Sequence, residues 1–241
     1  MTEALFWGLF SSAALFLGQW LAKPLGRSER AIGLMMGFGG GTLLAAVAYE
    51  LIPAGNITDG WQIIAWALVG ALVYYVGDRV IDSSGGEARL AVASGRAQGG
   101  SGMAMFLGAL LDGIPEAFIL GLGLALGGQI SLAFLAAIFV SNVPQGLAGT
   151  TSLQEAGTPD RRIAVMWGLL TVACGLASGL GYLMADHLSD LGTYASAFAG
   201  GAVLMMLADS MVPESYRHGG RLTGLLTVIG FLAAGILTVL Q

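Results

Sequence analysis

Eight apolar stretches, each long enough to cross a lipid bilayer, constrain this chain of 241 residues more than any other feature. A membrane-spanning helix needs about 20 predominantly apolar residues, and turn or capping residues separate these stretches. They run over Ala4–Ala22, Ala31–Ile52, Trp61–Gly77, Met103–Leu126, Ile130–Leu153, Ile163–Met184, Tyr194–Val212 and Leu222–Leu240. Only 10% of the residues are charged, too few to cover the surface of a soluble fold. We therefore expect an all-α, polytopic membrane protein with eight transmembrane helices.

The composition also limits the domain organisation and the partners. We expect residues 1–241 to form one transmembrane domain, with a single sizeable loop at residues 78–102. This loop is rich in Gly, Ser and Ala, a composition typical of a flexible linker. Cys174 is the only cysteine, which excludes a disulfide within the chain. Ten basic residues against fifteen acidic ones form no positive patch for nucleic acid.

The positions of the basic residues predict the orientation in the membrane. In an eight-span arrangement all ten fall in loops on one side: Lys23, Arg27, Arg30, Arg79, Arg89, Arg96, Arg161, Arg162, Arg217 and Arg221. Loops on the opposite side carry acidic residues and no Lys or Arg. The positive-inside rule therefore places the basic side in the cytoplasm and both termini outside it. We expect the membrane to be the inner or plasma membrane of the cell.

Two of the stretches resemble each other without a gap. Six residues of the second stretch match six of the seventh: Phe38, Gly40, Gly41, Leu44, Ala48 and Pro53 against Phe198, Gly200, Gly201, Leu204, Ala208 and Pro213. Because these stretches are five crossings apart, they run in opposite directions through the membrane. This pattern is typical of inverted repeats in secondary transporters. We expect a 3+2+3 arrangement, in which spans one to three mirror spans six to eight around a central pair; chance similarity between glycine-rich helices is the alternative.

The central pair carries polar residues near the middle of each span. Asp112-Gly113-Ile114-Pro115-Glu116-Ala117 and Ser141-Asn142-Val143-Pro144-Gln145-Gly146 share one pattern of polar, proline and small residues. Asp112 and Glu116, four residues apart, lie on one helix face. A carboxylate at this depth is costly without a partner or an aqueous cavity. Each proline breaks a helix hydrogen bond, so we expect two broken helices that form an oxygen-rich cage for a cation. In the alternative, the acids are protonated or hydrogen-bonded locally and the prolines only bend the helices.

These motifs resemble those of the ZIP family of divalent metal transporters, whose fourth and fifth helices carry His-Asn-x-Pro-Glu-Gly-like and His-Glu-x-Pro-Glu-Gly-like sequences. The end of the second stretch, Glu50-Leu51-Ile52-Pro53, is similar to that family's His-Leu-Leu-Pro. The resemblance implies metal ligands at Asp112, Glu116, Ser141, Asn142 and Gln145. It also implies that helices one, four, five and six move as a bundle against a scaffold of helices two, three, seven and eight.

Several residues depart from the family pattern. Both histidines, His187 and His218, fall in predicted loops, and Gln145 is neutral where the family has a glutamate. The sixth span offers Thr171, Cys174 and Ser178 but no carboxylate. We therefore expect one reduced site instead of a binuclear centre. Oxygen ligands favour harder ions such as Mn²⁺ or Mg²⁺, whereas the family implies Zn²⁺, with Fe²⁺ or Mn²⁺ as further options.

Acidic residues also lie near the two mouths of the expected path. Glu50 falls near the outer end of the second stretch and Asp209 near the cytoplasmic end of the seventh. Our hypothesis is that both attract cations; the alternative is that they contact headgroup water. Glu214 follows Pro213, and we expect it to be solvated at the interface.

The function expected from the sequence is that of a secondary transporter or facilitator for a divalent metal cation, which is the substrate; no resident cofactor is expected. One alternative is a membrane protein that binds a cation without transporting it, because Gln145 and the absence of membrane histidines reduce the site. An intramembrane enzyme fits less well, because Ser141 has no membrane histidine or lysine to activate it. The lipid bilayer and the cation are the expected partners, and a homodimer stays open.

Overall fold

The computed structural model describes residues 1–26, 28–52, 60–81, 101–127, 129–188 and 192–240, and every regular element in this part of the chain is a helix. The helices are α1 (Thr2–Leu25), α2 (Glu29–Ala46) with η1 (Val47–Leu51), α3 (Gly60–Ile81), α5 (Ser101–Gly127), α6 (Leu132–Glu155), α7 (Asp160–Leu188), α8 (Gly192–Met206) with η4 (Leu207–Met211) and α9 (Val212–Gly219), and α10 (Leu222–Leu240). They provide eight helical segments long and apolar enough to span a membrane, which confirms the all-α, eight-span prediction. The chain is an integral membrane protein.

Two boundaries differ from the sequence-based prediction. The loop expected at residues 78–102 is too long, because α3 continues to Ile81 and α5 begins at Ser101. The Asp78 side chain is buried in α3 and does not belong to a linker; residues 82–100 lie outside the described part of the chain. The seventh span continues past Val212, because Pro213 occupies the first turn of α9, where a missing N–H has no cost.

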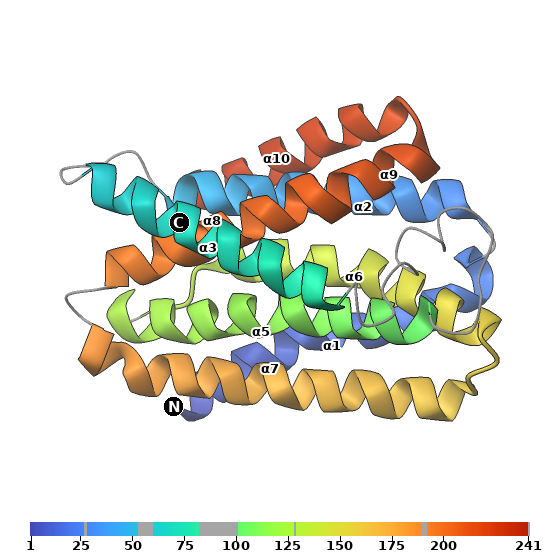
Figure 1. Cartoon of the computed structure of the whole chain (residues 1–241), viewed down its shortest axis with the longest axis horizontal. Coiled ribbons are helices and arrows are strands. Elements are labelled where there is room, and N and C mark those ends of the chain that lie inside the picture. The colour runs from blue at the N-terminus through green and yellow to red at the C-terminus, as the bar shows by residue number, and fades with distance from the viewer. Residues whose placement is uncertain (27, 53–59, 82–100, 128, 189–191, 241) are drawn as a thin grey trace.

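The helices pack as two groups. We call α1, α5, α6 and α7 the core bundle, and α2, α3, α8, α9 and α10, with the π-helical turns η1 and η4, the scaffold. Within the core bundle α1 packs on α6 and α7, and α5 packs on α7; within the scaffold α3 packs on α8, and α2 on α10 and α9. The groups meet mainly where α2 crosses α6, and Figure 1 shows them as a lower and an upper layer.

The inverted repeat is present in the packing as well as in the sequence. In the pair of α2 and α10, Gly41 lies so close to the backbone of Thr227 that a Cβ would overlap its carbonyl oxygen. In the pair of α8 and α3, Gly201 lies equally close to the backbone of Ala67. Gly201 and Thr227 follow Gly41 and Ala67 by the same 160 positions. The two matched stretches of the sequence are related by the same offset. The close helix crossing of α2 with α10 is therefore repeated in the crossing of α8 with α3.

A π-helical turn occurs at the same point of each repeat. The turn η1 covers Val47–Leu51 and η4 covers Leu207–Met211, again 160 positions apart. Each follows an α-helix directly and ends within two residues of a proline. Isolated π-helical turns are uncommon and occur frequently at functional sites, which directs attention to Glu50 in η1 and Ser210 in η4.

One end of the molecule collects the basic side chains, and we call it the basic end. All described basic residues lie at helix ends there: Lys23, Arg30, Arg79, Arg161, Arg162, Arg217 and Arg221. The connections from α1 to α2, α6 to α7 and α9 to α10 all lie on this side, at the right of Figure 1. Apolar side chains of α3 and α10 are widely exposed around the sides of the molecule, as expected for lipid contact.

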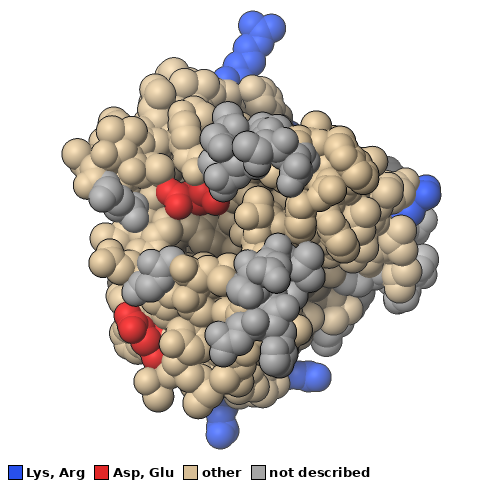
Figure 2. Space-filling view, turned by 90° about the vertical axis from the view of Figure 1, so that its left-hand side faces the viewer, with Lys and Arg blue, Asp and Glu red and all other residues tan. Residues whose placement is uncertain are grey.

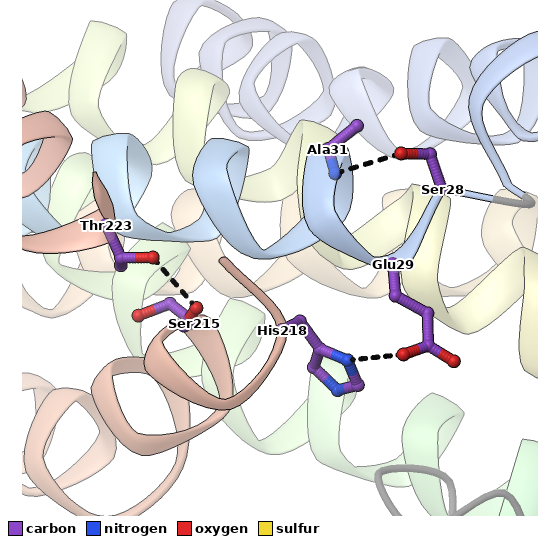
Figure 3. A network of polar contacts seen from close by, with 6 residues as sticks. All are labelled: Ser28, Glu29, Ala31, Ser215, His218 and Thr223. Carbon is purple, nitrogen blue, oxygen red and sulfur yellow. Dashed lines mark hydrogen bonds and ion pairs between the residues drawn. The ribbon is translucent and has the colours of Figure 1, made fainter. Parts of the chain in front are cut away.

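Side-chain hydrogen bonds fasten the scaffold at the basic end (Figure 3). Ser28 Oγ accepts from the Ala31 N–H at 3.3 Å and caps α2, as its sequence position predicts. The adjacent Glu29 approaches Nδ1 of His218 at 3.3 Å, and Thr223 Oγ1 donates to the Ser215 carbonyl at 3.0 Å. His218 therefore belongs to helix α9, where a loop was predicted, and its described contact ties α9 to α2.

Candidate metal site

Asp112 and Glu116 lie one turn apart on α5, in the interior of the protein. Their side chains are 9% and 1% exposed. Pro115 and Pro144 lie inside α5 and α6, and both helices continue through the proline without interruption. The prediction of two broken helices is therefore wrong. Proline still lacks an N–H group, so each helix loses one hydrogen bond to a carbonyl four residues earlier.

The two acids on α5 have different surroundings. The Tyr74 hydroxyl donates a 2.6 Å hydrogen bond to Asp112 Oδ1, from α3 of the scaffold to α5 of the core bundle. Both carboxylate oxygens of Glu116 are buried and accept no hydrogen bond from the described residues. The amide oxygen of Gln145, on α6, is likewise buried and accepts no hydrogen bond from the described residues. Buried polar atoms almost always have a partner, so these three oxygens are available to an electropositive group.

The other polar residues of α6 are used in helix packing. Ser141 Oγ donates to the Ile138 carbonyl of its own helix at 2.9 Å. Asn142 Nδ2 donates to the Ser11 carbonyl of α1 at 3.3 Å. Both side chains are buried. Asn142 thus links α6 to α1, whereas the Ser141 bond stays within α6, and the part of both residues in a metal site stays a prediction.

A small cavity lies between the core bundle and the scaffold, in the half of the molecule near the basic end. Its volume is about 40 Å³, more than the roughly 10–15 Å³ that one ordered water requires. We call it the basic-end cavity. Its lining comes from α2, α5, α6, α8, η4 and α9: Met36, Ala109, Asp112, Gln145, Ala148, Met206, Ser210, Met211 and Glu214. Asp112 and Gln145 are thus brought together, whereas Ser141 and Asn142 are not among the residues that line it.

Glu214 was not assigned to the site from the sequence, which predicts only that it is solvated at the interface; its side chain is half-buried. It lines the basic-end cavity with Asp112, because the chain continues as a helix through Pro213. The sequence did hold one signal for this position. Glu214 follows Ser210 by four residues, a spacing that places both on one helix face.

A second, larger cavity lies in the opposite half of the molecule, and we call it the opposite-end cavity. Its volume is about 300 Å³, and its polar lining consists of Glu50, Gln129, Ser131 and Ser196. Figure 2 faces this end and shows a hollow with acidic side chains beside it, while basic side chains appear only at the margin. Asp209 is exposed and lines neither of these two cavities. Of the two, Glu50 lines one of these cavities and Asp209 does not, and the mouth hypothesis stays a prediction for both.

The described residues contain no group of three or more His, Cys, Asp or Glu side chains that could hold a metal ion. A site built from the described residues around Glu116 would therefore use amide, hydroxyl or backbone oxygens as well as carboxylates. Gly113, within the Asp112–Ala117 motif, has a packing role: a Cβ there would lie 3.1 Å from Cys174 Sγ. The reduced site stays a prediction.

The fold and the placement of these residues define an eight-helix integral membrane protein with an inverted repeat and with cavities at the boundary of two helix groups. No family model matches the chain. A protein of Arabidopsis thaliana named "putative zinc transporter" is 24% identical over 195 residues. The match covers 77% of this chain and spans 30% of the length of the plant protein. This similarity is consistent with the resemblance to the ZIP family.

Proposed function

We propose that the protein moves a divalent metal cation across the membrane, through a site on α5 and α6 at Glu116, Asp112 and Gln145. One observation carries the proposal: three buried oxygens, two on Glu116 and one on Gln145, accept no hydrogen bond from the described residues. Carboxylates inside a membrane protein typically mark ion or proton paths. A bound cation would be the electropositive partner that these oxygens lack among the described residues.

The two cavities support a path with Glu116 between its ends. Ile119 and Leu120, one turn from Glu116 on α5, line the opposite-end cavity, and Asp112, one turn the other way, lines the basic-end cavity. A cation would enter beside Glu50, bind at Glu116 with Gln145, and leave past Asp112 and Glu214. Ser141 and Asn142 would complete the ligand set only after their present hydrogen bonds rearrange.

The basic end faces the cytoplasm in this proposal, because all described Lys and Arg residues lie at that end of the molecule. Both termini then lie outside the cytoplasm. The name of the Arabidopsis protein supports Zn²⁺ as the substrate. Oxygen donors support Mn²⁺ and Fe²⁺ as further substrates. Binding of a cation without transport is the alternative function, and the neutral Gln145 is the observation that favours it.

Uptake into proteoliposomes tests the proposal. Wild-type protein is reconstituted and screened with Zn²⁺, Fe²⁺, Mn²⁺, Cd²⁺ and Mg²⁺, and the active ion is then tested with the double variant Asp112→Asn, Glu116→Gln. We expect uptake to fall to the level of empty liposomes in the double variant. Glu155→Gln is the matched control, because Glu155 is exposed at the end of α6. Undiminished uptake in the double variant would remove the site, and metal binding without uptake of any ion would favour the alternative.

A further inference from the structure

An apolar cavity lies at the side of the molecule, where α5 of the core bundle meets α3 and α8 of the scaffold. We call it the lateral cavity. Its volume is about 400 Å³, larger than the roughly 150 Å³ of an apolar cavity that binds benzene or xenon. Large side chains form most of its lining: Trp66, Ile114, Pro115, Phe118, Tyr194 and Phe198. The volume is within the range of about 300–1,000 Å³ that is typical of ligand sites.

The lateral cavity offers few hydrogen-bonding groups to water. Among the described residues that line it, only Trp66 and Tyr194 carry a polar side-chain atom. The Tyr194 hydroxyl already donates a hydrogen bond to Oε1 of Gln62. An ordered water in a cavity needs about two to four polar partners, so this lining excludes ordered water. An occupant that fits the lateral cavity is therefore apolar.

The cavity is continuous with the lipid-facing side of α3. Trp66 in its wall is 45% exposed, and Val69 and Val73, which follow on the same helix face, are 42% and 56% exposed. In the wall formed by α5, Pro115 and Phe118 are half-buried. The hydrocarbon interior of a bilayer covers this side of a membrane-spanning molecule. A lipid chain therefore reaches the cavity without crossing a polar layer of the protein.

The lining residues place the cavity between the middle of the membrane and the end opposite the basic end. Pro115 lies near the middle of α5, whereas Trp66 lies in the second turn of α3 and Tyr194 in the first turn of α8. Both α3 and α8 begin at the end away from the basic end, at the left of Figure 1. A chain from the lipid leaflet at that end would run from Tyr194 toward Pro115.

We propose that the lateral cavity binds one acyl chain of a phospholipid from this leaflet. The hydrophobic effect gives little preference between apolar protein and lipid surfaces. An empty cavity, however, forfeits the van der Waals contacts of the side chains around it. One acyl chain supplies these contacts to the rings of Trp66, Phe118 and Phe198. Because its walls come from α5 and from α3 and α8, the bound chain contacts both helix groups.

The variant Ala195→Phe tests the site, because Ala195 is half-buried in the cavity wall and a ring there occupies the space of the chain. The matched control is Ala13→Phe, which adds the same ring at an exposed position of α1. The full chain is reconstituted with dioleoylphosphatidylcholine, extracted in mild detergent and weighed intact by native mass spectrometry. We expect one phospholipid to stay bound to the wild type and to Ala13→Phe, and none to Ala195→Phe.

Fluorescence places the bound chain. The protein is reconstituted in vesicles of dibrominated dioleoylphosphatidylcholine, whose bromine atoms quench tryptophan on contact. The contribution of Trp66 is the difference between each protein and the same protein with Trp66→Phe. We expect quenching of Trp66 to fall in Ala195→Phe and to stay unchanged in Ala13→Phe. If Ala195→Phe does not fold, Ala195→Leu replaces it, with the same expected direction in both measurements.

Three results would overturn the inference. The first is a wild type that retains no phospholipid, and the second is equal retention and equal quenching in the wild type and Ala195→Phe. The third is a wild-type dimer that becomes a monomer in Ala195→Phe, which would show that a second copy of the chain covers the cavity. None of these measurements uses a metal ion, so they test the lipid site independently of the proposed transport.

Discussion

Glu50 and Ser210 occupy equivalent positions in the two halves of the protein. They lie 160 residues apart, each in the π-helical turn of its repeat, and they line the opposite-end and the basic-end cavity respectively. Leu51 and Met211, the next residues, repeat this relationship. The inverted repeat therefore builds one cavity at each end of the molecule from the same local structure.

Cysteine labelling tests whether these two cavities open on opposite sides of the membrane. In a Cys174→Ala background we expect cysteine at position 50 to react with an impermeant thiol reagent added outside intact cells. Cysteine at position 210 should react only after permeabilisation, because we propose that the basic end faces the cytoplasm. Labelling yields are read by gel shift. Reaction of both positions from the same side would contradict the orientation, and the cysteine-free Cys174→Ala protein gives the background.

Charge at the two mouths should affect the capture of cations more than their binding at Glu116. We expect Glu50→Gln and Glu214→Gln to raise the apparent KM for cations approaching from their own side by about tenfold at low ionic strength, and less in high salt, because acidic mouths concentrate cations. Flux is measured in each direction across proteoliposomes. Asp209→Asn is the control, since Asp209 lines neither cavity. A larger effect of Asp209→Asn than of Glu214→Gln would restore the original mouth hypothesis.

The close helix crossings of the repeat predict a matched pair of destabilised variants. Gly41→Ala and Gly201→Ala each place a methyl group on a neighbouring carbonyl oxygen, and overpacking of this kind costs about 1–3 kcal/mol. We expect both to lower the unfolding temperature in detergent by similar amounts. Gly123→Ala meets no atom within 4 Å and should be neutral or slightly stabilising, because Ala favours a helix by roughly 0.8–1.0 kcal/mol over Gly. A Gly201→Ala protein as stable as Gly123→Ala would contradict the packing equivalence.

Bound cation should stabilise the protein through Glu116. At a free concentration about 100 times the dissociation constant, a ligand adds roughly 2.7 kcal/mol to the free energy of unfolding. We expect the transported ion to raise the unfolding temperature of the wild type and to leave that of Glu116→Gln unchanged. Chelation should reverse the shift. An equal shift in both proteins would show that the ion binds elsewhere, and Glu155→Gln should behave as the wild type.

Much of the fold was predictable from the sequence, because bilayer thickness fixes the length of an apolar helix. The eight spans and the offset between the repeats follow from apolar length and from a gap-free match around Gly41 and Gly201. The burial of Asp112 and Glu116 was also predictable, since both interrupt an otherwise apolar span. These features follow from the sequence without knowledge of contacts between side chains.

The features that were missed depend on contacts between distant segments. Tyr74 and Tyr75 are adjacent aromatic residues in one apolar stretch, and only the packing of α3 against α5 decides which of them reaches Asp112. Glu214 appeared to follow the end of a span, because Pro213 was interpreted as a terminator, although proline also fits the first turn of a helix. The same one-sided interpretation of proline produced the wrong prediction of broken helices at Pro115 and Pro144.

The most direct test of the account is to locate the ion in metal-loaded protein by anomalous X-ray diffraction. The account predicts an anomalous peak on α5 and α6, within coordinating distance, about 2.0–2.6 Å, of a Glu116 carboxylate oxygen and near the Gln145 amide oxygen. The peak should vanish in Glu116→Gln. A fully loaded, transport-active protein with its ion elsewhere, and with Glu116 and Gln145 unoccupied, would contradict the central claim.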